Sequence, residues 1–209
     1  ERFKDEFPRA LLPPHEFRTF NNESDEEMAK IIAETDILIS GAYKAAWRDP
    51  SGQHPKLIHS VGAGLDAIDL EAVPPGCPVC NVYGHDKGVA EHAFLLFMAL
   101  HKNLPKLDQK LRKGNWTMEQ PYLPEMRNRN LLILGLGHIG EQLVRWGKFL
   151  EMNITVLTRN MSDERAAKLG LDSSGTLDDL DQHLPNADFV VFAIPSATET
   201  DGLIGAAQF

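Results

Sequence analysis

The stretch Ile133–Trp146, "ILGLGHIGEQLVRW", decides the fold of this chain. It begins as an apolar run, is interrupted by Gly135, Gly137 and Gly140, and continues with the spacing of a helix. A G-x-G-x-x-G pattern between an expected strand and an expected helix is the context in which this motif carries weight. The first glycine permits a tight turn, the second lets a pyrophosphate approach the backbone, and the third lets helix and strand pack closely. The stretch therefore predicts a dinucleotide-binding turn, with a tight turn that binds no ligand as the alternative.

Composition and charge indicate a globular protein and exclude some classes of partner. The 209 residues are 43% hydrophobic and 24% charged, which is typical of a globular protein with one large or two small domains. A formal net charge of -9 argues against nucleic acid or an anionic membrane as the partner. The longest apolar run, Ala93–Leu100, is far shorter than the roughly 20 residues that span a bilayer. We therefore expect a soluble protein that binds neither nucleic acid nor membrane.

The two cysteines, Cys77 and Cys80, form "CPVC" and are followed by His85 and His92. A redox pair and a zinc site are both conceivable at this spacing. The segment follows "PPG" and has the character of a short strand, whereas a redox motif starts a helix. We therefore expect no metal site and interpret the cysteines as small hydrophobic residues in a buried strand. Together with the lack of a secretory signal pattern in a sequence that starts at Glu1, this indicates a cytoplasmic protein.

Strand and helix signals alternate along residues 1–86, as in parallel sheets covered by helices. A helix is expected over 24–35, where Ser24 and Glu27 form a capping box and Met28, Ile31 and Ile32 share one face. Strands are expected at 16–20, 36–40, 56–60 and 78–82. These elements fit one α/β domain over residues 1–86.

A second domain is expected over residues 87–209. It opens with a helix over 87–105 whose second half is apolar on nearly every side, which fits either a core helix or an interface helix. An amphipathic helix over 105–116 follows. Beyond it we expect three strands, at 131–135, 154–158 and 188–194, and helices at 139–151, 163–170 and 177–184.

The end of the second strand of this domain is where a dinucleotide-binding protein distinguishes its cofactors. Here Thr158, Arg159 and Asn160 provide no carboxylate that would repel a 2′-phosphate, and they provide one guanidinium that would pair with it. The sequence therefore favours NADP(H) over NAD(H). The alternative is that Arg159 is an ordinary exposed arginine.

Four stretches together resemble the D-isomer-specific 2-hydroxyacid dehydrogenase family, in the family's order and spacing. They are "HSVGAGLDAIDL" (59–70), "NVYGHDKGVAEHAFLLFMAL" (81–100), "LLILGLGHIG" (131–140) and "NADFVVFAIPSATETDGLIG" (186–205). The resemblance implies an α/β fold with a flavodoxin-like substrate domain and a Rossmann-type nucleotide-binding domain, both incomplete in this chain. It also implies a homodimer formed around the helix that contains Ala93–Leu100.

The resemblance implies roles for individual residues. The backbone of one glycine-rich loop would bind the substrate carboxylate, with an ordinary glycine turn as the alternative; this loop is Val61, Gly62, Ala63 and Gly64. His138 and Ile139 would lie beside the pyrophosphate, and Val89 near the nicotinamide. Ile194, Pro195 and Thr200 would line the cofactor, although "PSATET" stands where the family commonly has a leucine and a threonine after the proline.

The implied activity is NAD(P)-dependent reduction of a small 2-keto acid to a D-2-hydroxy acid. Glyoxylate and hydroxypyruvate are the expected substrates, because NADP-preferring relatives often favour them. The catalytic arginine, glutamate and histidine of the family follow the position of Phe209. Residues 1–10, "ERFKDEFPRA", resemble the first helix of the family, whose first strand precedes it. We therefore expect no catalytic residue in this chain and no turnover by the chain alone, and we interpret His92 as structural. The alternative is a non-catalytic dinucleotide-binding or co-repressor-like interaction module on the same fold.

Overall fold

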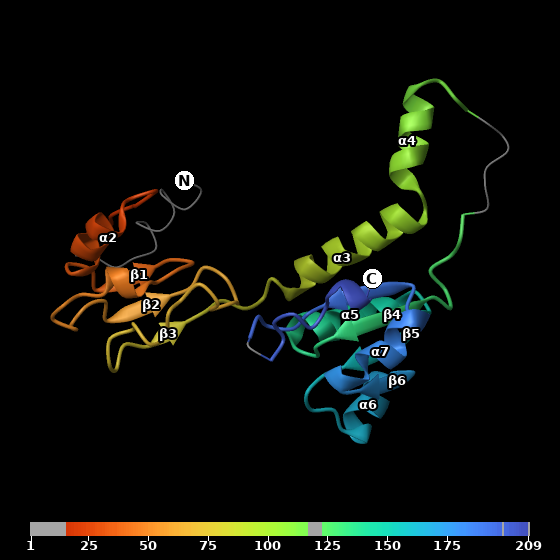
Figure 1. Cartoon of the computed structure of the whole chain (residues 1–209). Helices are drawn as coiled ribbons and strands as arrows, with labels where there is room; N and C mark the ends of the chain where they lie inside the picture. The colour runs from red at the N-terminus through yellow and green to blue at the C-terminus, as the bar shows by residue number, and fades with distance from the viewer. Residues whose placement is uncertain (1–15, 117–122, 198, 209) are drawn as a thin grey trace. The chain divides into compact units, whose positions relative to one another are not determined.

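A computed structural model describes residues 16–116, 123–197 and 199–208 of the chain. The chain divides into two compact units, Glu1–Val82 and Tyr83–Phe209, which we call the N-terminal unit and the C-terminal unit. Each unit is built on a parallel β-sheet (Figure 1). The predicted α/β fold is confirmed.

The N-terminal unit contains a three-stranded sheet with the order β1-β2-β3. Helix α2 (Asp25–Ile32) starts at the predicted capping box, in which Ser24 and Glu27 each accept a hydrogen bond from the other's backbone N–H group. Met28 and Ile32 are buried against Tyr43 and the middle strand, so one face of the helix covers the sheet. The remaining elements are β1 (Ile37–Ile39), η1 (Ala45–Trp47), β2 (Leu57–His59) and β3 (Val79–Cys80).

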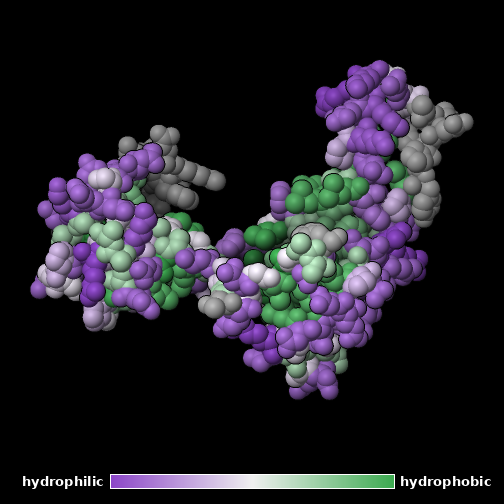
Figure 2. Space-filling view, viewed as in Figure 1, coloured by the Kyte–Doolittle hydropathy of each residue, from purple (hydrophilic) through white to green (hydrophobic). Residues whose placement is uncertain are grey.

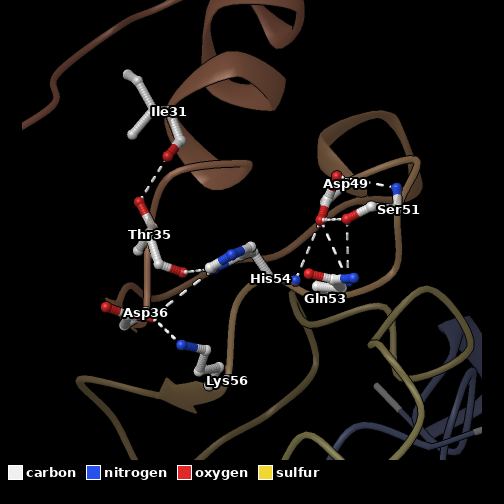
Figure 3. A network of polar contacts seen from close by, with 8 residues as sticks. All are labelled: Ile31, Thr35, Asp36, Asp49, Ser51, Gln53, His54 and Lys56. Carbon is white, nitrogen blue, oxygen red and sulfur yellow. Dashed lines mark hydrogen bonds and ion pairs between the residues drawn. The ribbon is translucent and has the colours of Figure 1, made fainter.

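A single carboxylate organises the connection between η1 and β2 (Figure 3). The buried Asp49 accepts hydrogen bonds from the backbone N–H groups of Ser51 (3.0 Å), Gln53 (3.2 Å) and His54 (3.2 Å), and from the Ser51 hydroxyl. These donors hold the pKa of Asp49 below its ordinary value, the Ser51 hydroxyl having the largest effect. Nδ1 of His54 then contacts the Thr35 carbonyl at 3.1 Å, which joins this connection to the segment that follows α2.

Two predictions for the N-terminal unit are wrong. Residues 16–20 form no strand, and Glu16–Thr19 are exposed. The alternation of polar and apolar residues there was not enough, because strand formation depends on the tertiary surroundings as well as on the pattern. Cys80 is exposed rather than buried, since β3 lies at the edge of the sheet, and Cys77 is half-buried. The helix expected near residues 1–10 lies outside the described residues.

The C-terminal unit contains a four-stranded parallel sheet with the order β6-β5-β4-β7 (Figure 1). In sequence order this is 3-2-1-4, which matches the first four strands of the Rossmann order 3-2-1-4-5-6. Leu131 and Ile133 in β4 pack on one face against helices α3 and α5, while Leu132 and Leu134 pack on the other face against Leu180. The elements are α3 (Asp86–His101), α4 (Leu104–Arg112), β4 (Asn130–Leu134), α5 (His138–Phe149), β5 (Asn153–Leu157), α6 (Asp163–Leu169), β6 (Ser173–Gly175), η2 (Leu177–Asp179), α7 (Leu180–His183), η3 (Leu184–Asn186), β7 (Phe189–Phe192) and η4 (Ala206–Gln208).

The prediction of three strands in this unit is wrong, because the sheet has a fourth strand, β6. Its three residues are Ser-Ser-Gly, which lack the apolar and β-branched side chains that indicate a strand. It forms by parallel pairing with β5, Thr155 lying opposite Ser173. The edge position explains why a strand without large apolar residues is tolerated.

Helix α3 is apolar on two faces. Ala90 and Phe94 are buried, and the Phe94 ring lies 6.3 Å from that of Trp146 in α5. Leu95 and Leu100 are 58% and 70% exposed in this chain. Figure 2 shows apolar residues gathered along α3 on the surface of the unit. No helix among the described residues has the length and apolar character needed to cross a membrane.

Candidate dinucleotide-binding site

The tight turn after β4 depends on Gly135. Its φ is +98°, a conformation that residues other than glycine rarely adopt. A Cβ atom at this position would lie 2.5 Å from the carbonyl oxygen of Ala193, the residue that follows β7. The Gly135 N–H group also donates to the Leu157 carbonyl at the end of β5 (2.8 Å). The turn therefore lies where the carboxyl ends of β4, β5 and β7 meet, the place where open α/β sheets bind ligands.

The other two glycines of the motif differ from each other. A Cβ atom at Gly140 would overlap the Gly135 carbonyl oxygen, so the close approach of α5 to the turn excludes a side chain there. Gly137 is exposed and has a φ of -92°, and no atom lies within 4 Å of the position that its Cβ would occupy. The packing of the chain therefore requires glycine at 135 and 140 and does not require it at 137.

Helix α5 begins at His138, directly after this open position. The first N–H groups of an α-helix have no partner within the helix, and they carry a partial positive charge that favours an anion. Open space in front of such a helix end is what a phosphate group needs. The residues present thus fit the pyrophosphate of a dinucleotide.

Three neighbours of the turn have different surroundings. His138 is exposed, and its ring lies 5.1 Å from that of Tyr83, a residue to which the sequence motifs assigned no role. Ile139 is half-buried and packs against the core beneath α5. Val89, in the first turns of α3, is 43% exposed.

The end of β5 opens onto a cavity of about 610 Å³. Thr158 is half-buried, and its N–H group donates to the Gly175 carbonyl of β6 (3.0 Å). No acidic side chain of the described ranges lies within ion-pair distance of Arg159, which is exposed, as is Asn160. The cavity is lined by Arg159, Asn160, Met161, Ser162, Asp163, Arg165, Ser174, Gly175 and Thr176.

Arg165, which the sequence did not single out, connects this cavity to the glycine turn. Its Nη2 atom donates to the Leu136 carbonyl (3.1 Å) and to a carboxylate oxygen of Glu141 in α5 (2.8 Å). Leu136 lies within the glycine motif itself. One guanidinium in α6 therefore contacts both the turn and the helix that follows it.

The segment after β7 forms a second cavity, of about 380 Å³. Ile194, Pro195 and Thr200 all line it. The Thr200 hydroxyl donates to the Pro195 carbonyl (2.8 Å) and accepts from the Ala197 N–H group (3.0 Å). Thr200 thus closes the loop that it belongs to as well as lining the cavity.

In the N-terminal unit, the loop of Val61, Gly62, Ala63 and Gly64 follows the middle strand β2. The buried Ser60 hydroxyl accepts from the Gly62 N–H group and donates to the Gly64 carbonyl, both at 3.2 Å. The Asn81 side-chain amide donates to the Ala63 carbonyl (2.9 Å). Sequence reasoning found the loop and missed Ser60 and Asn81, since no local pattern indicates hydrogen bonds of this kind.

The backbone N–H groups of this loop suit an anion. Those of Val61, Ala63 and Gly64 have no hydrogen-bond partner within the part of the chain that the structure describes. Val61 is 60% exposed, and a Cβ at Gly62 would meet no atom within 4 Å. Backbone donors without a partner in one loop are a feature of anion-binding sites. Across the described ranges, no group of three or more His, Cys, Asp or Glu side chains is arranged to hold a metal ion.

The sequence of the chain is similar to those of known proteins. The chain is 33% identical over 156 residues to D-3-phosphoglycerate dehydrogenase of Archaeoglobus fulgidus, covering 74% of this chain and 29% of that protein. It is 32% identical over 187 residues to D-3-phosphoglycerate dehydrogenase of Synechocystis, covering 88% of this chain and 33% of that protein. The chain thus spans about a third of the length of the curated relatives that it matches.

A solved structure gives the same fold. D-lactate dehydrogenase from Aquifex aeolicus, in complex with NAD and lactic acid, has a TM-score of 0.70 with this chain at 21% sequence identity, covering 82% of this chain and 52% of that chain. Residues 94–209 match the family model described as D-isomer specific 2-hydroxyacid dehydrogenase, NAD binding domain. The chain therefore belongs to the D-isomer specific 2-hydroxyacid dehydrogenase family.

Proposed function

We propose that this chain provides the NADP(H) site and part of the substrate site of a reductase that converts a small 2-keto acid into a D-2-hydroxy acid. The open space at Gly137, in front of the N-terminus of α5, carries this proposal. Neither packing nor backbone conformation requires glycine there, whereas a pyrophosphate that approaches the backbone would require it. Family membership supports a nicotinamide dinucleotide as that ligand.

When bound, the nicotinamide cofactor supplies or accepts a hydride. The residues of this chain would bind and orient the two reactants. Gly135, Gly137 and Gly140, with the first N–H groups of α5, would hold the pyrophosphate. The loop of Val61, Gly62, Ala63 and Gly64 would hold the substrate carboxylate through the N–H groups of its first, third and fourth residues, since the Gly62 N–H group donates to the Ser60 hydroxyl. We assign no catalytic residue within the described ranges, and we assign the reaction to a protein that also contains the family's arginine, glutamate and histidine.

The cofactor proposed is NADP(H) rather than NAD(H). Arg159 lines the cavity at the end of β5, and no described carboxylate neutralises it there. A guanidinium pairs well with a phosphate monoester, whereas NAD-binding relatives of this fold typically present an acidic residue to the ribose. Glyoxylate and hydroxypyruvate are proposed as substrates, and 3-phosphoglycerate, which the names of the two relatives contain, is the competing candidate.

Titration of this chain with NADPH and NADH by calorimetry tests the cofactor site. We expect NADPH to bind more tightly, and we expect Arg159→Asp to remove that preference. Arg145→Asp, the same charge change at an exposed position of α5, serves as the matched control and should leave the preference in place. An unchanged preference in Arg159→Asp would contradict the assignment of NADP(H).

Activity is tested on the full-length protein, with glyoxylate and hydroxypyruvate in the direction of reduction and 3-phosphoglycerate in the direction of oxidation. Turnover of either keto acid with NADPH supports the proposal. Intact cofactor binding without turnover of any of the three would instead favour a non-catalytic dinucleotide-binding or co-repressor-like module.

We also propose a cytoplasmic homodimer in which α3 faces the same helix of a second copy. The exposed side chains of Leu95, Leu96 and Leu100 support this, together with the interface that the family resemblance implies. Leu96→Glu should convert the dimer to a monomer in light scattering, whereas Leu111→Glu in α4 should leave it a dimer. A wild-type protein that is monomeric at micromolar concentration would refute the proposal.

A further inference from the structure

Two guanidinium groups line the cavity at the end of β5, and they differ in what holds them. Arg159 has no ion-pair partner among the residues that the structure describes, and it is exposed. Arg165 is half-buried and is fixed by its two contacts, the Leu136 carbonyl and the Glu141 carboxylate. The first arginine is therefore adjustable, whereas the second occupies a defined position in the cavity wall.

The guanidinium of Arg165 has N–H donors that are available to a ligand. A guanidinium carries five N–H groups in a planar fork. Both side-chain hydrogen bonds of Arg165 use Nη2, which leaves Nε and Nη1 without a hydrogen-bond partner in the described ranges. Phosphate oxygens are the acceptors that best match such a fork. The hydroxyls of Ser174 and Thr176 line the same cavity and add neutral donors, while the Asp163 carboxylate, also in the lining, opposes an anion.

We propose that Arg165 is a second specificity-determining residue for the 2′-phosphate of NADP(H), acting together with Arg159. This rests on the proposed function of the site. Because Arg165 also contacts Leu136 in the glycine motif, a phosphate that engages Nε or Nη1 would be held by the same side chain that positions the pyrophosphate turn. One ligand would then contact both the cavity and the turn. The two arginines would distinguish NADP(H) from NAD(H) by binding the ribose phosphate.

Glu141 lowers the positive charge that the cavity presents to an anion. Its carboxylate neutralises part of the Arg165 charge at 2.8 Å and lies on the first turn of α5. Replacing it by glutamine keeps the shape and removes the negative charge, so the cavity becomes more attractive to a dianion. Glu141→Gln should therefore tighten the binding of a 2′-phosphorylated ligand and leave the unphosphorylated ligand nearly unchanged.

The experiment measures dissociation constants of this chain by calorimetry for two ligand pairs, NADPH with NADH and 2′,5′-ADP with 5′-AMP. The second pair contains only the adenosine part of the cofactor, so it reports on the cavity without the nicotinamide. In Arg165→Gln we expect about a tenfold weaker binding of NADPH and 2′,5′-ADP, and less than a twofold change for NADH and 5′-AMP. Arg165→Lys keeps the charge and should recover part of the discrimination.

The outcomes separate the two proposals. Equal weakening of all four ligands by Arg165→Gln, with or without a lower melting temperature, means that Arg165 only positions the turn and overturns the inference. No weakening of any ligand overturns it as well. A wild-type chain that binds NADH more tightly than NADPH, or binds neither, overturns the proposed NADP(H) site itself. Selective weakening of the 2′-phosphorylated ligands together with tighter binding in Glu141→Gln supports the inference.

Discussion

The two glycine-rich segments of this molecule obtain their shapes in different ways. In the C-terminal unit, Gly135 and Gly140 are required by the backbone itself, because a side chain at either position would overlap a carbonyl oxygen. In the N-terminal unit, the loop after β2 is held by the side chains of Ser60 and Asn81. Glycines alone therefore do not identify a site. Within the two segments, Gly137 and Gly62 are the positions at which a Cβ would meet no other atom within 4 Å, so a ligand has room to approach the backbone there.

The strongest test of this contrast is Gly135→Ala. The substitution places a Cβ at a positive φ and 2.5 Å from the Ala193 carbonyl oxygen, so it adds backbone strain and overlap together. We expect the free energy of unfolding of the C-terminal unit to fall by about 3 kcal/mol, since each of the two effects costs about 1–3 kcal/mol. Urea denaturation followed by circular dichroism measures the change. A loss below about 0.5 kcal/mol, the range of a neutral surface substitution, would show that packing does not shape this turn.

Gly137→Ala is the matched experiment. It should leave the stability nearly unchanged and weaken the binding of the cofactor. Its φ of -92° suits alanine and no atom lies near the new Cβ, so stability should change by no more than about 0.5 kcal/mol. Binding of NADPH should weaken by about tenfold or more, because the methyl group occupies the path of the phosphates. Calorimetry measures this, and binding as tight as in the wild type would mean that the open space is not a phosphate site.

For the side-chain-held loop we expect a smaller effect. Asn81→Ala removes the donor to the Ala63 carbonyl and should cost about 1 kcal/mol, the typical net value of a hydrogen bond. It should also raise amide hydrogen exchange in the loop from Val61 to Gly64. Asn21→Ala, at an exposed position of the same unit, is the control and should change neither quantity. Destabilisation without faster exchange in the loop would mean that Asn81 acts elsewhere.

The same contrast explains what could be predicted from the sequence. The glycine turn and the capping box of α2 were both predicted, because each depends on neighbouring residues and leaves a fixed spacing in the chain. The roles of Asn81 and Arg165 were missed, since their partners lie 18 and 29 positions away and the contacts form only once the sheets are assembled. Local sequence patterns thus predicted the turns, whereas the side chains that hold the loop after β2 are known only from the tertiary structure.

The errors in secondary structure have a related cause. Residues 16–20 alternate like a strand and form none, whereas the Ser-Ser-Gly strand β6 lacks every strand signal and still pairs with β5. In both segments the tertiary surroundings decide the outcome rather than intrinsic preference. Exposure of Cys80 follows from the same fact, because the edge position of β3 is a property of the sheet and not of the strand.

Acid should weaken the connection between η1 and β2, and this is the smallest effect of the series. The pKa of Asp49 in the folded N-terminal unit is held below its ordinary value of about 3.9 by the hydroxyl and amide donors around it. The ionised carboxylate therefore contributes its full stability above pH about 4, and this contribution is lost as the pH falls through the lower folded value. Asp49→Asn should be less stable than the wild type at neutral pH, and the difference should shrink as the pH approaches 3. Residue-resolved exchange at the amides of Gln53 and His54 measures it locally. A difference that stays constant from pH 7 to pH 3 would show that the charge of Asp49 does not hold this connection. The contrast between a turn shaped by backbone packing and loops held by side chains would then rest on Ser60 and Asn81 alone.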